Sequence, residues 1–457
     1  MAKISNLILR AALVPGALLL AGLPAWPQAA PAADQPAIAV TGLVDTEDRM
    51  LAPPPVSGED YPVVFSTETR TNFLRGGITF DFAHSDNVLA NTGTSPISDQ
   101  SYSIWPTIAL DETTGRTKLA FSYAPGFTFY QQNSGLDEAD QNLAADYQYR
   151  LSPHVTFRVR DAFQKSSNAF NSPGEGLATG VSGSAGGANN LVIAPIADRL
   201  INTGNAGITY QFSENAMIGA NVTFNNLHYP DANQVLGSLY DSSSQVASVF
   251  HSFRVSRRQY LGVSYQYQRL LAYPVGGTTE TQTNAVLGFY TWLATSKFSA
   301  SAFAGPQFAA TSQLGLPDSH LTAPTAGGSL SWQGERTALA ASYSHAITGG
   351  GGLIGASRAD GANAFVRQML SKRWQASLAG GYVDNRIIQV ADLPNTSGHS
   401  VTGSVAVQHQ MTTQLAVQAG YTRLRQQYDD VPAISLHPDT NREWVTVSYQ
   451  FTKALGR

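Results

Sequence analysis

The stretch TKLAFSYAPGFTFY, residues 117–130, alternates between two kinds of side chain. Its large apolar and aromatic residues share one parity, whereas Ala, Ser, Gly and Thr dominate the other. Successive residues of a β-strand point to opposite faces of the sheet. One face of this strand is therefore bulky and apolar, and the other is small and almost uncharged. The pattern by itself leaves open which of the two faces meets water.

The whole chain shares this shortage of charge. Charged residues make up 13% of the 457 residues, against about 25% in typical soluble domains. The formal net charge of −4 gives no basic footprint for nucleic acid, so we expect no nucleic-acid partner. The same alternating texture continues from about residue 72 to the C-terminus, which favours one repetitive β-structure over several domains.

The first residues have the layout of a secretory signal peptide. Lys3 and Arg10 precede an apolar run at 11–23, which is followed by small residues. That run is shorter than the roughly 20 residues of a membrane-spanning helix. We predict a cleaved signal peptide over 1–32 and a flexible periplasmic N-terminal segment over 33–72, which is rich in acid and proline. The chain has no Cys, which excludes disulfides, thiolate metal sites and a lipoprotein anchor.

No later stretch is apolar for long enough to form a transmembrane helix. A chain that crosses a bilayer without helices must form a closed barrel, because unpaired strand edges are not tolerated in lipid. Alternating segments of suitable length number about eighteen. They cover residues 73–84, 100–111, 117–130, 139–150, 155–166, 197–212, 216–228, 243–254, 259–270, 278–293, 297–310, 325–333, 337–347, 357–370, 374–384, 397–411, 414–428 and 441–452.

The connections between these segments alternate in length. Tight turns such as SPH, SRR and SKR alternate with longer loops along the chain. Outer-membrane barrels have short periplasmic turns and long extracellular loops. We therefore predict an all-β fold over 73–457, a transmembrane antiparallel β-barrel of about 18 strands. The bulky face of 117–130 then meets lipid and its small face the lumen, and Pro125 marks a bulge or a local break in strand pairing.

Several segments carry a resemblance to a known family. They are GGITFDFAHSDNVL at 76–89, YAPGFTFY at 123–130 and ADYQYRLSPHVTFRVRDAF at 145–163. With them the chain resembles the outer-membrane β-barrel porins, including barrels encoded with exopolysaccharide export systems. The resemblance implies a Gram-negative outer membrane, a pore or export-accessory role, and no catalytic residues. The segment EWVTVSYQF at 443–451 resembles the C-terminal strand that the outer-membrane assembly machinery recognises, which implies that machinery and outer-membrane lipid as partners.

Five charged residues fall on the face that we assign to the lumen. They are Arg158, Arg160, Arg150, Asp146 and Asp81. Such charges either select permeant solutes or form ion pairs that brace the wall. The loop at 166–195 is the longest irregular stretch; it either folds into the lumen and narrows it or is a mobile surface loop.

Barrels of 16–18 strands leave an aqueous channel, so the sequence predicts passive passage of small polar solutes. Two alternatives stay open, an accessory barrel of exopolysaccharide export and a structural or adhesive surface barrel. Residues 350–355, GGGLIG, formally fit G-x-G-x-x-G, but no β-α-β unit surrounds them. We expect no enzyme activity, no catalytic or metal site and no cofactor.

Overall fold

The structure, a computed structural model, describes residues 50, 72–88, 96–166, 198–230, 239–274, 277–313, 316–350, 354–388, 397–429 and 439–455. The predicted signal peptide at 1–32 lies outside these residues, and so does the segment at 33–72 apart from Met50 and Asn72. The predicted loop at 166–195 also lies outside them beyond Ser166. Among the described residues, no helix has the length and apolar character needed to cross a membrane.

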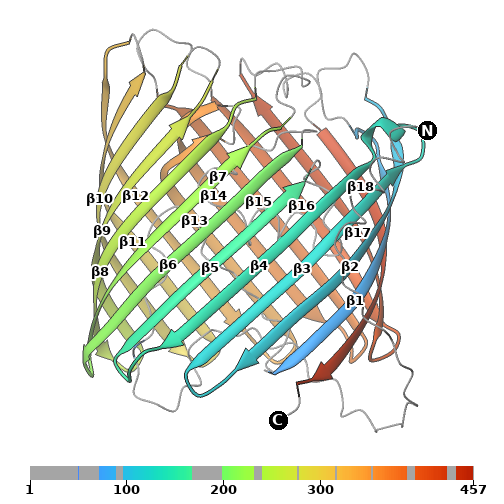
Figure 1. Ribbon diagram of the computed structural model, residues 1–457, viewed down its shortest axis with the longest axis horizontal. Coiled ribbons are helices and arrows are strands. Elements are labelled where there is room, and N and C mark those ends of the chain that lie inside the picture. The colour runs from blue at the N-terminus through green and yellow to red at the C-terminus, as the bar shows by residue number, and fades with distance from the viewer. Residues whose placement is uncertain are drawn as a thin grey trace, which may run out of the picture. The chain divides into compact units, whose positions relative to one another are not determined.

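Eighteen antiparallel strands form one closed sheet (Figure 1). They are β1 (Phe73–Ser85), β2 (Asp99–Thr113), β3 (Thr117–Tyr130), β4 (Glu138–Arg150), β5 (Val155–Ser166), β6 (Arg199–Ser213), β7 (Ala216–His228), β8 (Ser242–Ser256), β9 (Gln259–Ala272), β10 (Thr279–Thr295), β11 (Phe298–Gln313), β12 (Ser319–Gln333), β13 (Thr337–Gly350), β14 (Ile354–Met369), β15 (Trp374–Ile387), β16 (Ser397–Gln410), β17 (Leu415–Tyr428) and β18 (Asp439–Ala454). A short 3-10 helix, η1 (Ser134–Leu136), lies between β3 and β4.

Each strand pairs with its neighbours in sequence, and β18 pairs with β1 to close the ring. Tight turns join the strands at one end, such as Thr113 to Thr117 and Ser256 to Gln259, and the longer connections lie at the other. We call these the turn end and the loop end. All eighteen predicted strands are present, and the predicted all-β barrel is confirmed.

The largest difference from the predicted strands is at β12. The sequence predicts a strand over 325–333, but β12 begins six residues earlier, at Ser319. The stretch before 325 contains Pro324, which suggests a loop because proline lacks an amide donor. In the barrel Pro324 lies directly opposite Pro306 of β11 within an uninterrupted register. The neighbouring strand therefore fixes this segment as a strand despite its local sequence.

Pro125 interrupts pairing on one side of β3 only. Toward β4 the register is continuous, and Pro125 lies opposite Gln141. Toward β2 the pairing stops at Ile104 opposite Phe127 and resumes at Ile108 opposite Tyr123. The gap contains Pro106 as well as Pro125, so both strands lack an amide donor there. The predicted local break in pairing is confirmed.

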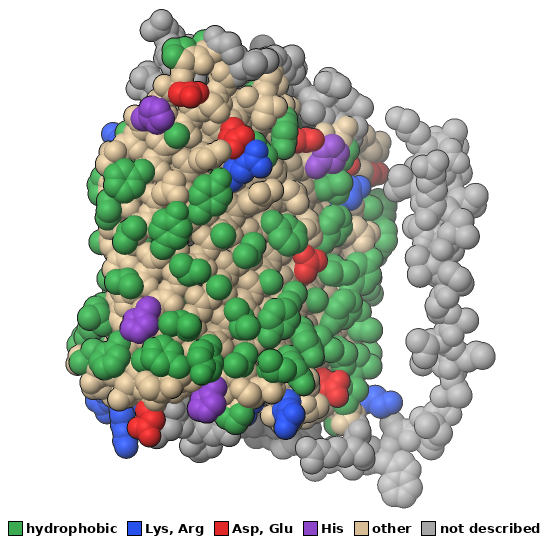
Figure 2. All heavy atoms as spheres, turned by 60° about the vertical axis from the view of Figure 1, so that its left-hand side comes forward, with side chains coloured by type: hydrophobic (Ala, Val, Ile, Leu, Met, Phe, Trp, Pro, Cys, Tyr) green, Lys and Arg blue, Asp and Glu red, His purple; other side chains and the backbone are tan. Residues whose placement is uncertain are grey.

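The larger side chains of the strands point to the outside of the barrel. On β9, Leu261 and Val263 are 53% and 57% exposed, whereas Ser264 between Val263 and Tyr265 is buried. Hydrophobic side chains cover the outer wall in Figure 2, with a dense row near one end and charged groups mostly near the ends. Trp332 and Trp374 lie beside the tight turns on this face. An apolar band bounded by aromatic residues is the outer surface of a transmembrane barrel.

Several aromatic rings lie flat against the inner wall instead of projecting into the lumen. A Cβ at Gly126 would lie 2.4 Å from the ring of Trp105, and one at Gly262 would lie 2.3 Å from the ring of Phe289. Only glycine leaves room for a ring to lie across the neighbouring strand at this distance. The alternating pattern of β3 suggests that the lumen face is small and polar. The inner wall of the barrel also carries large aromatic side chains, so it is not uniformly of that kind.

Candidate functional site

The lumen wall is the candidate functional site, and its charges are distributed unevenly. All five predicted lumen charges lie on the inner face, because they pair across strands with residues of the inner parity. The charged residues on the inner faces of β1–β6 are Arg75, Asp81, Asp99, Asp111, Lys118, Glu138, Asp140, Asp146, Arg150, Arg158, Arg160 and Arg199. On the described inner faces of β7–β17 the charged residues are Arg254 and Arg367 alone. One third of the barrel thus holds most of the lumen charge.

The inner face of β3 near the turn end is open to solvent. Lys118, Ala120 and Ser122 all point inward and are exposed. Next to them, Asp146 of β4 pairs with Arg158 of β5. The Arg158 Nε donates to Asp146 Oδ1 at 3.0 Å, and Arg158 Nη2 donates to Asp146 Oδ2, so the contact is bidentate. The Arg158 side chain remains 54% exposed.

Arg160 lies directly across from Asp146 in the strand register. Asp146 nevertheless binds Arg158, and within the described part of the chain Arg160 has no ion-pair partner. It is half-buried among amides and hydroxyls, since Asn205 of β6 faces it and donates to Thr223 Oγ1 at 2.7 Å. Arg160 is therefore the lumen arginine of this wall whose charge is not compensated by a carboxylate.

Arg150 has a different position from the other predicted arginines. It is the last residue of β4, beside the tight turn to β5. Together with Arg116, His154 and Glu214 it lines a groove at the turn end of the barrel. The predicted strand 139–150 also ends at Arg150, and the structure places this residue on the inner face at the rim of the barrel.

Asp81 is buried at the seam where the barrel closes. The Arg442 Nη2 of β18 lies 2.8 Å from Asp81 Oδ2, and both side chains are 5% exposed. The Thr446 hydroxyl donates to Asp81 Oδ1 at 2.7 Å. Asp81 and Thr446 are direct partners in the β1–β18 register. Arg442 is not among the predicted lumen charges, although it lies within the predicted strand 441–452 and has the same parity as Thr446.

A further charged group lies at the loop end of β4 and β6. Asp140 is 1% exposed, and its charge and that of Glu138 act on Arg199 across the wall. Tyr229, just beyond β7, is close to the same arginine, and its burial raises the pKa of its hydroxyl to about 12. The hydroxyl is therefore neutral at physiological pH. Asp140 and Tyr229 are buried in this cluster, whereas Glu138 and Arg199 are half-buried.

Apolar contacts join strands that lie far apart in the ring, on the side away from β3–β5. Leu270, Ala309, Ile347 and Ile388 are buried together near the loop end, although they come from β9, β11, β13 and the end of β15. β9 also contacts β14, which lies five strands away around the ring. Strands so far apart in the sheet come together only if the wall is bent at this end.

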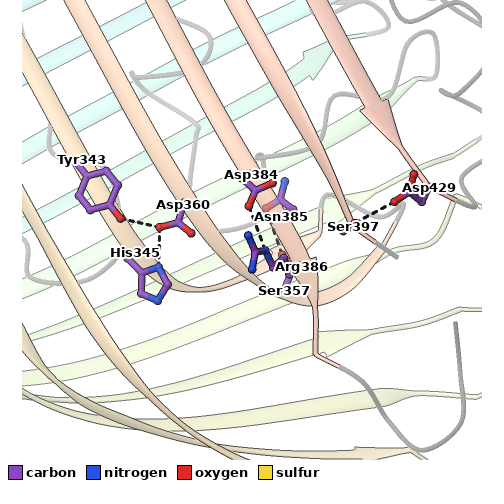
Figure 3. A network of polar contacts seen from close by, with 9 residues as sticks. All are labelled: Tyr343, His345, Ser357, Asp360, Asp384, Asn385, Arg386, Ser397 and Asp429. Carbon is purple, nitrogen blue, oxygen red and sulfur yellow. Dashed lines mark hydrogen bonds and ion pairs between the residues drawn. The ribbon is translucent and has the colours of Figure 1, made fainter. Parts of the chain in front are cut away.

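Polar contacts lie near the loop end of β13–β17, most of them on the outer face and one, between Ser357 and Asn385, on the inner face (Figure 3). The Tyr343 hydroxyl donates to Asp360 Oδ1 at 2.7 Å, and His345 Nδ1 lies 2.7 Å from the same oxygen. On β15, Arg386 Nε donates to Asp384 at 3.3 Å. Figure 3 shows Tyr343 and His345 both directed at Asp360. Among the described residues, no three His, Asp or Glu side chains are grouped for a metal ion.

Comparisons with known proteins give structural similarity only. No family model matches the chain, and no curated protein matches it. The iron transporter FrpB of Neisseria meningitidis, F5-1 variant, superposes with a TM-score of 0.41 at 10% identity, covering 84% of this chain and 69% of that one. OccAB4 of Acinetobacter baumannii superposes with a TM-score of 0.41 at 9% identity, and the match covers 84% of this chain and 99% of the OccAB4 chain.

The outer membrane protein OpdK of Pseudomonas aeruginosa superposes with a TM-score of 0.39 at 10% identity, and the match covers 83% of this chain and 99% of the OpdK chain. Similarity at this level carries no argument about solute, partner or mechanism.

Proposed function

We propose that the protein is an outer-membrane pore for passive passage of small polar solutes. The observation that carries the proposal is the contrast between its lumen walls. The inner face of β3–β5 near the turn end is charged and is exposed or half-exposed, whereas Leu287, Phe289 and Phe303 on β10 and β11 are buried. A water-filled path along β3–β5 agrees with this distribution, because hydrated solutes need a polar, accessible wall.

The proposed membrane position rests on the outer surface of the barrel. Its strands alternate apolar side chains toward the outside, and the apolar band is closed around the ring because every described strand has two paired edges. A closed sheet leaves no edge for lipid to meet. Outer-membrane barrels of bacteria are antiparallel and have even strand numbers, and eighteen antiparallel strands agree with that rule.

The charge on the exposed wall favours anions among small polar solutes. Lys118, Arg158 and Arg160 are cations on this wall; Asp146 compensates Arg158, and Asp111 of β2 interacts with Lys118, which leaves Arg160 as the cation without a described carboxylate partner. A low-dielectric wall focuses the field of uncompensated charges into the lumen and raises the local concentration of ions of opposite sign. We therefore expect a weakly anion-selective pore.

Conductance across planar bilayers tests the proposal. We expect the purified, folded protein to insert and to give discrete conductance steps in salt. We also expect vesicles that contain it to swell in small uncharged sugars at a rate that falls as the sugar becomes larger. Inserted protein that gives neither conductance nor swelling would contradict a passive pore and leave a structural barrel.

The described lumen gives no observation that favours polysaccharide export. Sugar rings stack on exposed aromatic faces, but Trp105, Phe289 and Phe303 are at most 3% exposed. A role in polysaccharide export therefore rests on the sequence resemblance alone.

A further inference from the structure

One residue from the part of the chain before β1 lies against the inner wall of the barrel. Met50 is 8% exposed and is packed with Met217, Tyr260 and Leu293. These three side chains come from β7, β9 and β10, and all three have the inner parity. Met50 belongs to the same compact unit as the barrel, Pro36–Arg457.

The contact combines apolar burial with a polar anchor. Phe250 of β8 packs against the cluster from the side. The backbone N–H of Met50 donates to Gln211 Oε1 of β6 at 3.2 Å. The thioether side chain of methionine is flexible and fits irregular apolar gaps. We call the set Met217, Phe250, Tyr260 and Leu293 the Met50 pocket.

The Met50 pocket explains an otherwise unusual part of the wall. Met217, Tyr260 and Leu293 each lie within three residues of a tight turn, so the pocket is at the turn end. The inner wall of a water-filled barrel is normally polar. Apolar side chains at its mouth are stable when another apolar group covers them, because burial removes their surface from water. Met50 is such a group and lies on them in the structure.

We propose that the Met50 pocket is a docking site for the N-terminal segment of this same chain, with Met50 as the anchoring residue. Its occupant is thus neither a solute nor a second protein. The pocket is on the wall across the ring from β1, because β10 and β1 are nine strands apart in a ring of eighteen. The anchored residue therefore lies far from the strand that follows it in sequence. The inference does not depend on whether the barrel conducts.

Methionine oxidation tests the contact in the unmodified protein. Peroxide converts accessible methionine to the sulfoxide, and the chain carries its own exposed control, because Met411 at a tight turn is 49% exposed. In folded full-length protein in vesicles, we expect Met50 to be oxidised at least about tenfold more slowly than Met411, which corresponds to ~1.4 kcal/mol of protection. Mass spectrometry of peptides gives both rates from one sample. Equal rates in the native protein would overturn the proposal.

Pocket variants separate docking from general protection. Tyr260→Ala or Leu293→Ala should raise the oxidation rate of Met50 toward that of Met411. The matched control is Leu261→Ala, which removes an outward side chain 53% exposed on the same strand. If the control and the pocket variants raise the rate equally, the pocket does not hold Met50. Resistance of the folded barrel to SDS at room temperature identifies any variant that fails to fold.

A cross-linking measurement keeps the test decisive if a pocket variant misfolds. The chain has no Cys, so pairs can be introduced without background. Met50→Cys combined with Thr291→Cys, which faces inward next to Leu293, should be joined by a short bis-maleimide. Met50→Cys combined with Ser122→Cys on the inner face of β3 should not. A yield with Ser122→Cys equal to or greater than that with Thr291→Cys would place Met50 elsewhere and overturn the proposal.

Discussion

Two ion pairs on the lumen wall have the same chemistry in different surroundings. Asp81 and Arg442 are both 5% exposed and join β1 to β18, the seam that closes the barrel. Asp146 and Arg158 join β4 to β5, with Arg158 54% exposed. A buried charge left without its partner destabilises a protein strongly, whereas an exposed pair contributes little. The first pair therefore stabilises the closure of the barrel, whereas the second lies on an accessible part of the lumen wall and contributes little to stability.

The largest expected effect is the loss of the buried partner. Arg442→Ala leaves the Asp81 carboxylate buried beside Thr446 without its cation. We expect the free energy of unfolding to fall by ~3–5 kcal/mol. Arg158→Ala at the exposed pair should lower it by less than about 1 kcal/mol. Urea unfolding of both variants in the same vesicles measures the difference, and similar losses in the two would remove the distinction between the pairs.

The next effect tests whether the wall beside the exposed pair is wet. Phe121 and Ser122 are neighbours on β3 that point outward and inward, and Ser122 is exposed within the lumen. Phe121→Arg places a cation against lipid, which costs ~2–4 kcal/mol near the bilayer midplane. Ser122→Arg places the same cation in the lumen and should fold almost as well as wild type. The yield of heat-modifiable barrel reports both, and the opposite ranking would mean that the two faces are reversed.

A smaller effect concerns the uncompensated cation. Arg160→Gln removes a positive charge that no described carboxylate balances, so the pore should become less anion-selective. The reversal potential under a salt gradient measures this shift. It should shrink as the ionic strength rises, because the screening length falls to ~3 Å at 1 M salt. A shift that is independent of salt would point to a change in pore shape instead.

The smallest effect is expected for a change that conserves charge. Asp146→Asn combined with Arg158→Gln removes one anion and one cation that neutralise each other. The reversal potential of the double variant should stay at the wild-type value. Arg158→Gln alone leaves the Asp146 carboxylate without its cation, so the reversal potential should shift toward cation selectivity. If the double variant shifts as far as Arg160→Gln does, then the two charges of the pair act on ions separately.

The strand pattern could be read from the sequence because it depends on neighbouring residues along the chain. The parity of Arg158 and Asp146 is fixed once β4 and β5 are strands, since side chains alternate with a period of two. The turn at Ser152 and Pro153 then makes the two strands adjacent. Local alternation therefore predicted the fold and the side of the wall on which each lumen charge lies.

Which charges are buried, paired or free depends on contacts that no local pattern contains. Asp81 and Arg442 are separated by 361 residues in sequence and meet because the ring closes. Asp146 binds Arg158, not Arg160 directly across from it, because the bidentate geometry is satisfied at the diagonal position. In the sequence, the alternating pattern does not distinguish Phe289 and Met217 from other residues that face the lumen. Their burial follows from Gly262 and from Met50, which come close only in the folded barrel.

The sequence by itself thus determined that this chain forms an antiparallel barrel of about eighteen strands and which face of each strand is turned inward. Alternation, turn residues and the absence of a long apolar helix are sufficient for this, because each acts over a few residues. The tertiary structure decided which part of the lumen wall is exposed, which lumen ions are neutralised, and where Met50 lies. Burial and ion pairing depend on distances between strands far apart in sequence, and closing the sheet is what sets those distances.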